Sequence, residues 1–145
     1  MKLSLKIVTP ERIVFEDEVD SISVMTETGE ITVLPNHVPL VSLLRAGEMR
    51  LMDNKNQTLL AVSTGLIEVR PGNTVIVLAD TAERSEELEL EEIEKARAQA
   101  EKNLSEARNQ NDVAFADAAA HLERELARYR VATKRKYKDV GKQIR

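Results

Sequence analysis

The hydrophobic period of this chain changes near residue 82, and that change constrains the fold more than any other feature. From Lys2 to about Asp80, apolar residues alternate with polar ones or form short continuous runs. A period of two is typical of β-strands, whose successive side chains point to opposite faces. After residue 82, apolar residues recur at spacings of three and four, as in an amphipathic helix. We therefore predict an α+β chain, with an all-β part over residues 1–82 and a helical part over residues 83–145.

The first part of the chain is a series of short apolar stretches separated by turns. The stretches that predict strands are LSLKIV, RIVF, SISVM, EITVL, EMRLM, TLLAV, LIEV and TVIVLA. Pairs of turn-forming residues separate them, namely Thr9-Pro10, Thr28-Gly29, Pro35-Asn36, Ala46-Gly47, Asp53-Asn54, Thr64-Gly65 and Pro71-Gly72. This spacing favours an all-β sandwich or barrel over βαβ units. In RPGNT, we expect Pro71 to preset φ and Gly72 to supply a positive φ, which predicts a tight hairpin.

Two apolar stripes in the second part indicate two helices. The first stripe consists of Leu90, Ile93, Arg97, Ala100, Leu104 and Ala107. The second consists of Phe115, Ala119, Leu122, Leu126 and Tyr129. The segment RNQND between them has no apolar residue and ends in Asn111 and Asp112, which are good N-cap candidates. The pattern therefore predicts an αα-hairpin with a short turn.

The apolar faces of this hairpin are thin, because they are rich in alanine, as in AFADAAAHL. Each alanine buries little area, so we expect the hairpin to be marginal alone, with weak mutual packing of its two helices. Residues 73–140 contain no Gly or Pro, and helix propensity is high throughout. Strong local helicity with weak packing suits a movable element, although a hairpin docked permanently on the sandwich fits the pattern equally well.

Composition excludes several classes of function. The chain has no cysteine, which removes disulfides, thiolate nucleophiles and the usual structural zinc sites, and favours an intracellular protein. The longest apolar runs fall far short of the roughly 20 residues that span a bilayer, and the N-terminus lacks a signal-peptide core. We therefore expect a soluble cytoplasmic protein. Aromatic residues make up 3% of the chain, so it offers few stacking platforms for nucleic-acid bases.

Charge is unevenly placed along the chain, although the net charge is only -4. An acidic block comprises Glu83, Glu86, Glu87, Glu89, Glu91, Glu92 and Glu94. A basic end comprises Arg124, Arg128, Arg130, Lys134, Arg135, Lys136, Lys138, Lys142 and Arg145. These charges are either solvated helix faces with a frayed tail, or a contact for an acidic protein surface, because opposite charges set orientation and encounter rate.

The residue pattern alone leaves more than one class of function open. One alternative is a freestanding adaptor whose basic helical tail binds acidic protein or nucleic acid, and steep salt dependence would be its signature. An enzyme is the other class, but the sequence shows no catalytic triad, metal cluster or phosphate loop. His37 could act as a general base, yet Glu30 is the nearest carboxylate partner within its segment. We therefore interpret His37, held between Pro35 and Pro39, as an interface residue.

Two long segments carry a resemblance to a known family. They are VTPERIVFEDEVDSISVMTETGEITVLPNHVPLVSLLRAGEMRL and STGLIEVRPGNTVIVLADTAER. Together they resemble the epsilon subunit of bacterial F-type ATP synthases. The segment from glutamate to proline and histidine and the Gly-x-x-Glu-Val strand are its specific marks. With the layout of the helices, the resemblance covers about residues 4–133.

The resemblance implies a non-catalytic rotor subunit of a proton- or sodium-translocating ATP synthase. In that family the sandwich packs on the gamma subunit and rests on the loops of the c-ring. The helical hairpin folds down on the sandwich or extends into the alpha/beta catalytic head, where it blocks ATP hydrolysis. The resemblance further implies no nucleic-acid partner. It places the protein at the cytoplasmic face of the bacterial plasma membrane, as a peripheral protein attached through the complex alone.

The resemblance also suggests site residues. It implies that the edge facing the c-ring and gamma contains Glu30, Pro35, Asn36 and His37. Thr32 and Asn36 stand where the family usually has glycine, and Asn tolerates the left-handed backbone conformation. For the inhibitory contact with the beta subunits we expect the cations of the second helix, Arg124, Arg128, Arg130 and Lys134. The extension from Lys134 to Arg145 is either a disordered tail or a contact for anionic lipid or acidic protein.

Many bacterial members of the family bind ATP through the hairpin, and the matching residues here are altered. Leu88 and Glu89 replace the first pair of the motif, Glu92 stands at the arginine position and Ile93 at the alanine. On the second helix, Arg124 and Arg128 match. An anion beside a triphosphate costs much of the electrostatic attraction. We therefore expect ATP to bind weakly or not at all, and we expect no metal and no cofactor.

Overall fold

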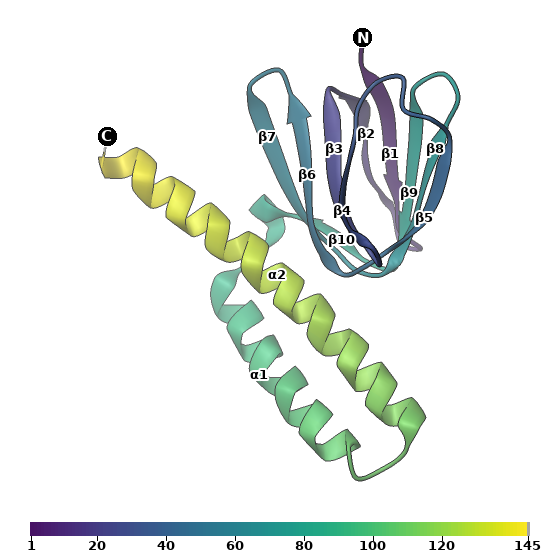
Figure 1. Cartoon of the computed structure of the whole chain (residues 1–145). Helices are drawn as coiled ribbons and strands as arrows, with labels where there is room; N and C mark the ends of the chain where they lie inside the picture. The colour runs from purple at the N-terminus through teal and green to yellow at the C-terminus, as the bar shows by residue number, and fades with distance from the viewer. Residues whose placement is uncertain (145) are drawn as a thin grey trace.

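The computed structural model describes the backbone of residues 1–144 and the side chains of residues 1–135. It shows a β domain followed by two packed helices, which confirms the predicted α+β class (Figure 1). Ten strands lie within these residues: β1 Leu3–Val8, β2 Ile13–Val19, β3 Ser21–Thr26, β4 Gly29–Val33, β5 Leu40–Leu44, β6 Gly47–Asp53, β7 Asn56–Val62, β8 Gly65–Arg70, β9 Thr74–Ala79 and β10 Ala82–Arg84. A 3-10 turn and two helices follow: η1 Ser85–Glu87, α1 Leu90–Ala107 and α2 Asp112–Ile144.

The strands form one hydrogen-bonded path that curls into a sandwich or near-barrel. The order along this path is β10-β7-β6-β3-β5-β8-β9-β1-β2, and β4 pairs with β3 beside it. Among the described pairings, β1 and β9 are parallel and the others are antiparallel. Because the path curls, the inward faces of all ten strands enclose a single core.

The period of two in the sequence produces this core. In β1, for example, Leu3, Leu5 and Ile7 are buried, whereas the residues between them are not. Each of the ten strands contributes at least one buried apolar side chain to the same cluster. Burying apolar area is the main favourable term in folding, so the sandwich is stabilised chiefly by its own side chains.

Two strands lie outside the stretches that predicted strands. The segment LVSLL of β5 is apolar on both faces: Leu44 is buried, while Val41 and Leu43 are exposed. A short apolar run without alternation does not by itself distinguish a strand from a buried helical segment, and LVSLL was not among the stretches predicted as strands. Strand β10 has three residues, too few to show a period, and it begins at Ala82 and ends two residues beyond the expected boundary. It pairs with the end of β7.

The turn residues adopt the backbone conformations that their types allow. Gly72 has a φ of +82°, which confirms the tight hairpin predicted between β8 and β9. Asn36 has a φ of 66°, in the left-handed region that asparagine tolerates. Thr32, in contrast, lies within β4, where its hydroxyl is 2.8 Å from that of Ser23 on β3. This cross-strand pair needs no glycine.

The two helices form the predicted αα-hairpin. The backbone N–H of Ala114 donates to Asn111 Oδ1 at 2.8 Å, so Asn111 is the N-cap of α2. On α1 the buried residues are Ile93, Ala100 and Ala107, all members of the predicted stripe. The Arg97 guanidinium lies over the Tyr129 ring at 4.3 Å from its centroid, which explains an arginine within an apolar stripe.

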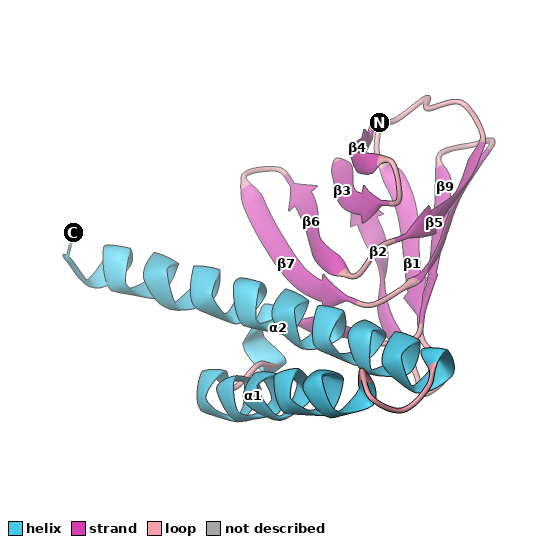
Figure 2. Ribbon diagram, turned by 60° about the horizontal axis from the view of Figure 1, so that its bottom comes forward, coloured by secondary structure: helices cyan, strands magenta, loops and turns pink. Residues whose placement is uncertain are grey.

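The buried face of α2 differs from the predicted stripe. Among its residues up to Arg135, the buried ones are Glu125, Ala127, Val131 and Ala132, whereas Phe115 is 38% exposed. The reason is that α2 packs against two surfaces, with α1 on one side and β6 and β7 on the other (Figure 2). A helix covered from two sides buries a wider arc, shifted away from the face directed at its partner helix alone.

Candidate functional site

The contact between α2 and the β domain contains several ion pairs, made by Arg128 and Lys134 with carboxylates of both parts. It has a small apolar centre, separate from the core of the sandwich, made of Ala61, Leu88, Ile93, Val131 and Ala132. In both ribbon views α2 lies between α1 and the strands β6 and β7 (Figures 1 and 2). The polar groups around this centre determine how firmly the helix is held.

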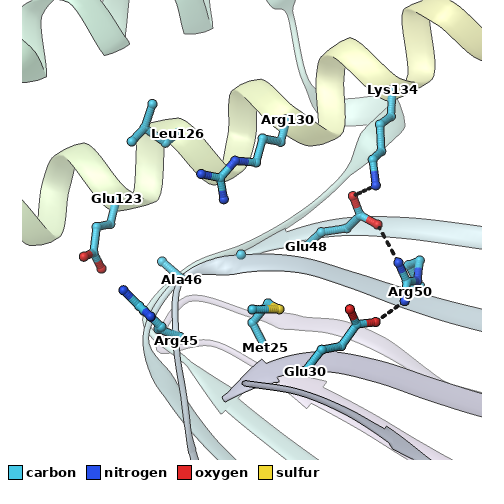
Figure 3. A pocket seen from close by; sticks show the side chains of 11 residues that line it. Met25, Glu30, Arg45, Ala46, Glu48, Arg50, Glu123, Leu126, Arg130 and Lys134 are labelled. Atoms are coloured by element: carbon cyan, nitrogen blue, oxygen red, sulfur yellow. Dashed lines mark hydrogen bonds and ion pairs between the residues drawn. The ribbon is translucent and has the colours of Figure 1, made fainter. Parts of the chain in front are cut away.

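Lys134 makes one of these polar contacts. Its Nζ lies 2.6 Å from Glu48 Oε2 on β6, and Glu48 is only 12% exposed (Figure 3). Arg50, also on β6, approaches the other oxygen of Glu48 at 3.6 Å and pairs with Glu30 on β4. Glu48 therefore sits beneath α2 with two cations beside it, which reduces the cost of burying its charge.

Arg128 makes the second contact, with two carboxylates. Its Nη1 donates to Glu125 Oε2 at 2.8 Å and its Nε donates to Glu83 Oε2 on β10 at 3.2 Å. Burial alone would lower the pKa of Arg128, but Glu83 and Glu125 outweigh this effect and raise it. Glu125 is 2% exposed, with Arg124 at 3.6 Å and His121 at 3.5 Å. The arginine thus stays charged and is shared between its own helix and the sheet.

The linker between β10 and α1 is fixed from both sides. From α2, Arg135 donates to the carbonyl oxygens of Ser85 and Leu88, the latter at 2.9 Å. From the β1–β2 turn, Arg12 donates to both oxygens of Glu87, at 3.2 and 2.7 Å. The hydrogen bond from Arg12 holds the pKa of Glu87 below its ordinary value. Release of α2 would therefore remove the Arg135 contacts and leave the Arg12 contact in place.

A cleft of about 500 Å³ lies between α2 and the turn that joins β5 to β6 (Figure 3). Arg130 on α2 and Arg45 on the turn line it, and Glu30 lines it from β4. This places Arg130 and Lys134 on the side of α2 that faces the β domain. Of the predicted cations, Arg124 and Arg128 both contact Glu125. The side chains of the basic extension from residue 136 onward lie outside the described residues.

The structure separates the residues predicted for the c-ring and gamma edge. Pro35, Asn36 and His37 lie in the loop between β4 and β5, where the Asn36 N–H donates to the Asn73 side chain in the β8–β9 turn at 2.7 Å. His37 Nδ1 is 2.7 Å from the carbonyl oxygen of Val38. Glu30, by contrast, lies at the start of β4 beside the cleft under α2. The loop and Glu30 therefore belong to different surfaces in this structure.

Most of the residues predicted to contact a nucleotide already contact other side chains of this chain. Leu88 is fully buried in the apolar centre, and Glu89 precedes the first turn of α1. Arg124 and Arg128 both contact Glu125, so their charges are already paired with a carboxylate of α2. This arrangement agrees with the prediction that ATP binds weakly or not at all, which remains a prediction.

Sequence reasoning missed an apolar row on the outer face of the sandwich. The strand registers place Leu43, Leu66 and Leu78 side by side, and Val8 and Ile13 continue the row across β1 and β2. Leu43, Leu78 and Ile13 are 55%, 47% and 52% exposed. The signal was present in LVSLL and TVIVLA, which do not alternate and therefore place apolar side chains on both faces.

The described residues contain neither a membrane-spanning helix nor a metal-binding cluster. None of the helices traced there is long and apolar enough to cross a membrane. The side chains that the structure describes contain no group of three or more His, Cys, Asp or Glu placed to hold a metal ion. The charged contact under α2, the outer apolar row and the β4–β5 loop are thus the candidate functional surfaces.

The sequence of the chain matches a known protein family. Residues 2–85 match the family described as ATP synthase, Delta/Epsilon chain, beta-sandwich domain. The chain is 44% identical over 138 residues to the ATP synthase epsilon chain of Chloroflexus aggregans, covering 95% of this chain and 97% of that one. It is 40% identical over 136 residues to the epsilon chain of Herpetosiphon aurantiacus, covering 94% and 98%.

Solved structures share the fold at low sequence identity. A chain in the cryo-EM structure of the Euglena gracilis mitochondrial ATP synthase (OSCP/F1/c-ring) superimposes with a TM-score of 0.71 at 20% identity, covering 84% of this chain and 76% of that one. A chain in the Tetrahymena thermophila central stalk/c-ring structure gives 0.59 at 15% identity, covering 92% and 96%. The protein belongs to the ATP synthase epsilon chain family, whose members are non-catalytic subunits of the central stalk.

Proposed function

We propose that this chain helps to couple ion translocation through the c-ring to ATP synthesis, and that its helices inhibit ATP hydrolysis. The proposed partners are the gamma subunit, the polar loops of the c-ring and, in the inhibited state, the alpha/beta catalytic head. The subunit would be peripheral at the cytoplasmic face of the bacterial plasma membrane, attached through the complex. Different surfaces of the molecule support each contact.

The outer apolar row supports packing on the gamma subunit. Five side chains aligned across β5, β8, β9, β1 and β2 form a continuous surface that the hairpin leaves uncovered. Contiguous exposed apolar surface of this kind marks protein interfaces, because covering it removes apolar area from water. Leu43 and Leu78 are the side chains whose replacement by arginine should weaken gamma binding most.

The β4–β5 loop supports the contact with the c-ring loops. Leu34 and Val38 are 56% and 71% exposed on either side of His37. The hydrogen bond of Asn36 to Asn73 ties the loop to the neighbouring hairpin, so these side chains are presented from a fixed backbone. We assign Pro35, Asn36 and His37 to this contact, while a role of Glu30 there remains a prediction.

The cations of α2 carry the proposal of inhibition. Arg124, Arg128, Arg130 and Lys134 lie along three turns of one helix, and opposite charge steers and orients protein contacts. An acidic segment of the beta subunits would bind these cations after α2 leaves the sandwich. The contacts of Arg128 and Lys134 with Glu83 and Glu48 show that two of the four cations already bind carboxylates within the chain.

Truncation after Glu87 tests the proposal in the assembled complex. This cut keeps β10, η1 and the pair of Arg12 with Glu87, so the sandwich retains its own contacts. We expect the truncated subunit to assemble with gamma and the c-ring and to raise the rate of ATP hydrolysis. The matched control replaces Arg124 and Arg130 with alanine in the full chain, which should raise hydrolysis less. Equal hydrolysis in the truncated and intact complexes would disprove inhibition by the helices.

A further inference from the structure

The docking surface of α2 and the sheet beneath it carry matching rows of three residues. On the sheet, Ala61 of β7 is directly opposite Glu48 of β6 on one side and Glu83 of β10 on the other. Directly opposed residues point to the same face of a sheet, and neighbouring strands are about 4.8 Å apart. The row therefore presents a carboxylate, a small apolar residue and a second carboxylate to the helix.

The helix presents the complementary order. Val131 is fully buried and shares the apolar centre with Ala61. Three residues along an α-helix turn by about 300°, so Arg128 and Lys134 flank Val131 at about 60° to either side. Each reaches the carboxylate on its own side: Arg128 contacts Glu83 at 3.2 Å and Lys134 contacts Glu48 at 2.6 Å. The two rows therefore match: Arg128, Val131 and Lys134 of the helix lie against Glu83, Ala61 and Glu48 of the sheet, in that order.

These two carboxylates differ from Glu125, which lies on α2 itself and moves with it. A contact within α2 is retained whether the helix is docked or released, so it cannot favour either state. Glu48 and Glu83 belong to the sandwich, and their contacts exist only in the docked state. They are 12% and 28% exposed, so water screens these contacts less than it screens pairs on an open surface.

We propose that Glu48 and Glu83 form an internal substitute for the acidic target of α2 and compete with it for Arg128 and Lys134. This inference rests on the proposed inhibition of hydrolysis and names what regulates it. The docked chain satisfies the two cations within itself, so the catalytic head must displace these carboxylates to bind them. The strength of inhibition is then set by the sandwich as well as by α2.

The test replaces both carboxylates in the full chain, as Glu48→Gln/Glu83→Gln, and leaves every cation in place. The chain has no cysteine, so two introduced ones, Lys55→Cys and Asn109→Cys, take a pair of fluorophores that report docking by energy transfer. We expect the ratio of docked to released hairpin to fall about tenfold, the factor that corresponds to about 1.4 kcal/mol. In the complex, the same variant should hydrolyse ATP more slowly than the wild type.

The matched control is Glu16→Gln/Glu18→Gln, which removes two exposed carboxylates from edge strand β2. It changes the net charge equally and should leave docking and hydrolysis unchanged. The exchange Glu48→Lys/Lys134→Glu reverses one pair and should restore docking relative to Glu48→Lys alone. That rescue distinguishes a specific contact from general destabilisation.

The outcomes separate this inference from the proposed function. If the double glutamine variant stays docked, the inference is wrong even where truncation after Glu87 still raises hydrolysis. If the variant releases the hairpin and hydrolysis does not fall, competition with the head is wrong. If truncation leaves hydrolysis unchanged, the inhibitory function itself fails.

Discussion

The core of the sandwich and the contact under α2 are built in different ways. The core receives apolar side chains from every strand, and most of these are almost completely buried. The contact under α2 has five buried apolar residues, two of them alanine, surrounded by ion pairs. Burial of large apolar side chains contributes more per residue than partly exposed ion pairs do. From this difference we predict that the sandwich folds without the hairpin and that the hairpin is released more easily than the core unfolds.

The same substitution made in both regions should give different results, and the larger effect belongs to the sandwich. Ile67 is fully buried in the middle of β8, with strands β5 and β9 on either side. Ile67→Ala leaves a cavity that the surrounding strands cannot fill, so we expect a loss of about 4 kcal/mol in the free energy of unfolding. Urea denaturation should show the same loss in the full chain and in the chain truncated after Glu87. A much smaller loss in the truncated chain would show that the helices support the core.

Ile93→Ala makes the corresponding change in the contact under α2. Ile93 is also fully buried, but its cluster joins Ala61 of β7 to residues of the linker and of α2, and the linker and α2 can shift to close the cavity. We expect a cost of about 2 kcal/mol, at the low end for such a change. Hydrogen exchange should show faster exchange in α1 and α2, while the amides of β8 and β9 keep their protection. Loss of protection in the sandwich would show that the two regions unfold together.

This contrast also explains how much of the fold the sequence could predict. Alternation in LSLKIV and SISVM was sufficient for the β half, and Gly72, Asn36 and Asn111 each adopt the local role that their types favour. Strand β5 was not predicted, because an apolar stretch that is exposed on one face has the same composition as a stretch that is buried on both faces. Period reports which residues lie on one face, but it does not report whether a partner protein covers the other.

The residues that hold the hairpin were less accessible to sequence reasoning. The row of Glu48, Ala61 and Glu83 depends on the registers of β6, β7 and β10, and two further strands separate β10 from the β6–β7 hairpin in the sequence. Likewise, the burial of Glu125 depends on how α2 packs in three dimensions, although the arginines that contact it, Arg124 and Arg128, lie on the same helix. The sequence identified the cations of α2, but their partners required the three-dimensional arrangement.

We expect the smallest effect on the free energy of unfolding at the linker between the sandwich and the helices. Arg12 holds the pKa of Glu87 below its ordinary value of 4.5. A carboxylate with a lowered pKa stabilises the folded state above its unfolded-state pKa, and this contribution disappears as the pH falls through the folded-state value. The pair is exposed, with side chains 50% and 37% accessible, so we expect less than about 0.5 kcal/mol from it at neutral pH.

Comparison of the wild type with Glu87→Gln isolates this contribution. The difference in the free energy of unfolding should be constant above about pH 5 and should vanish as the pH falls well below 4.5. Glu86→Gln, at the neighbouring exposed position in η1, provides the control and should show no such pH dependence. High salt should reduce the difference, because exposed charges are screened within about 3 Å at 1 M. A difference above 1 kcal/mol that resists salt would mean that the linker is held as firmly as the core.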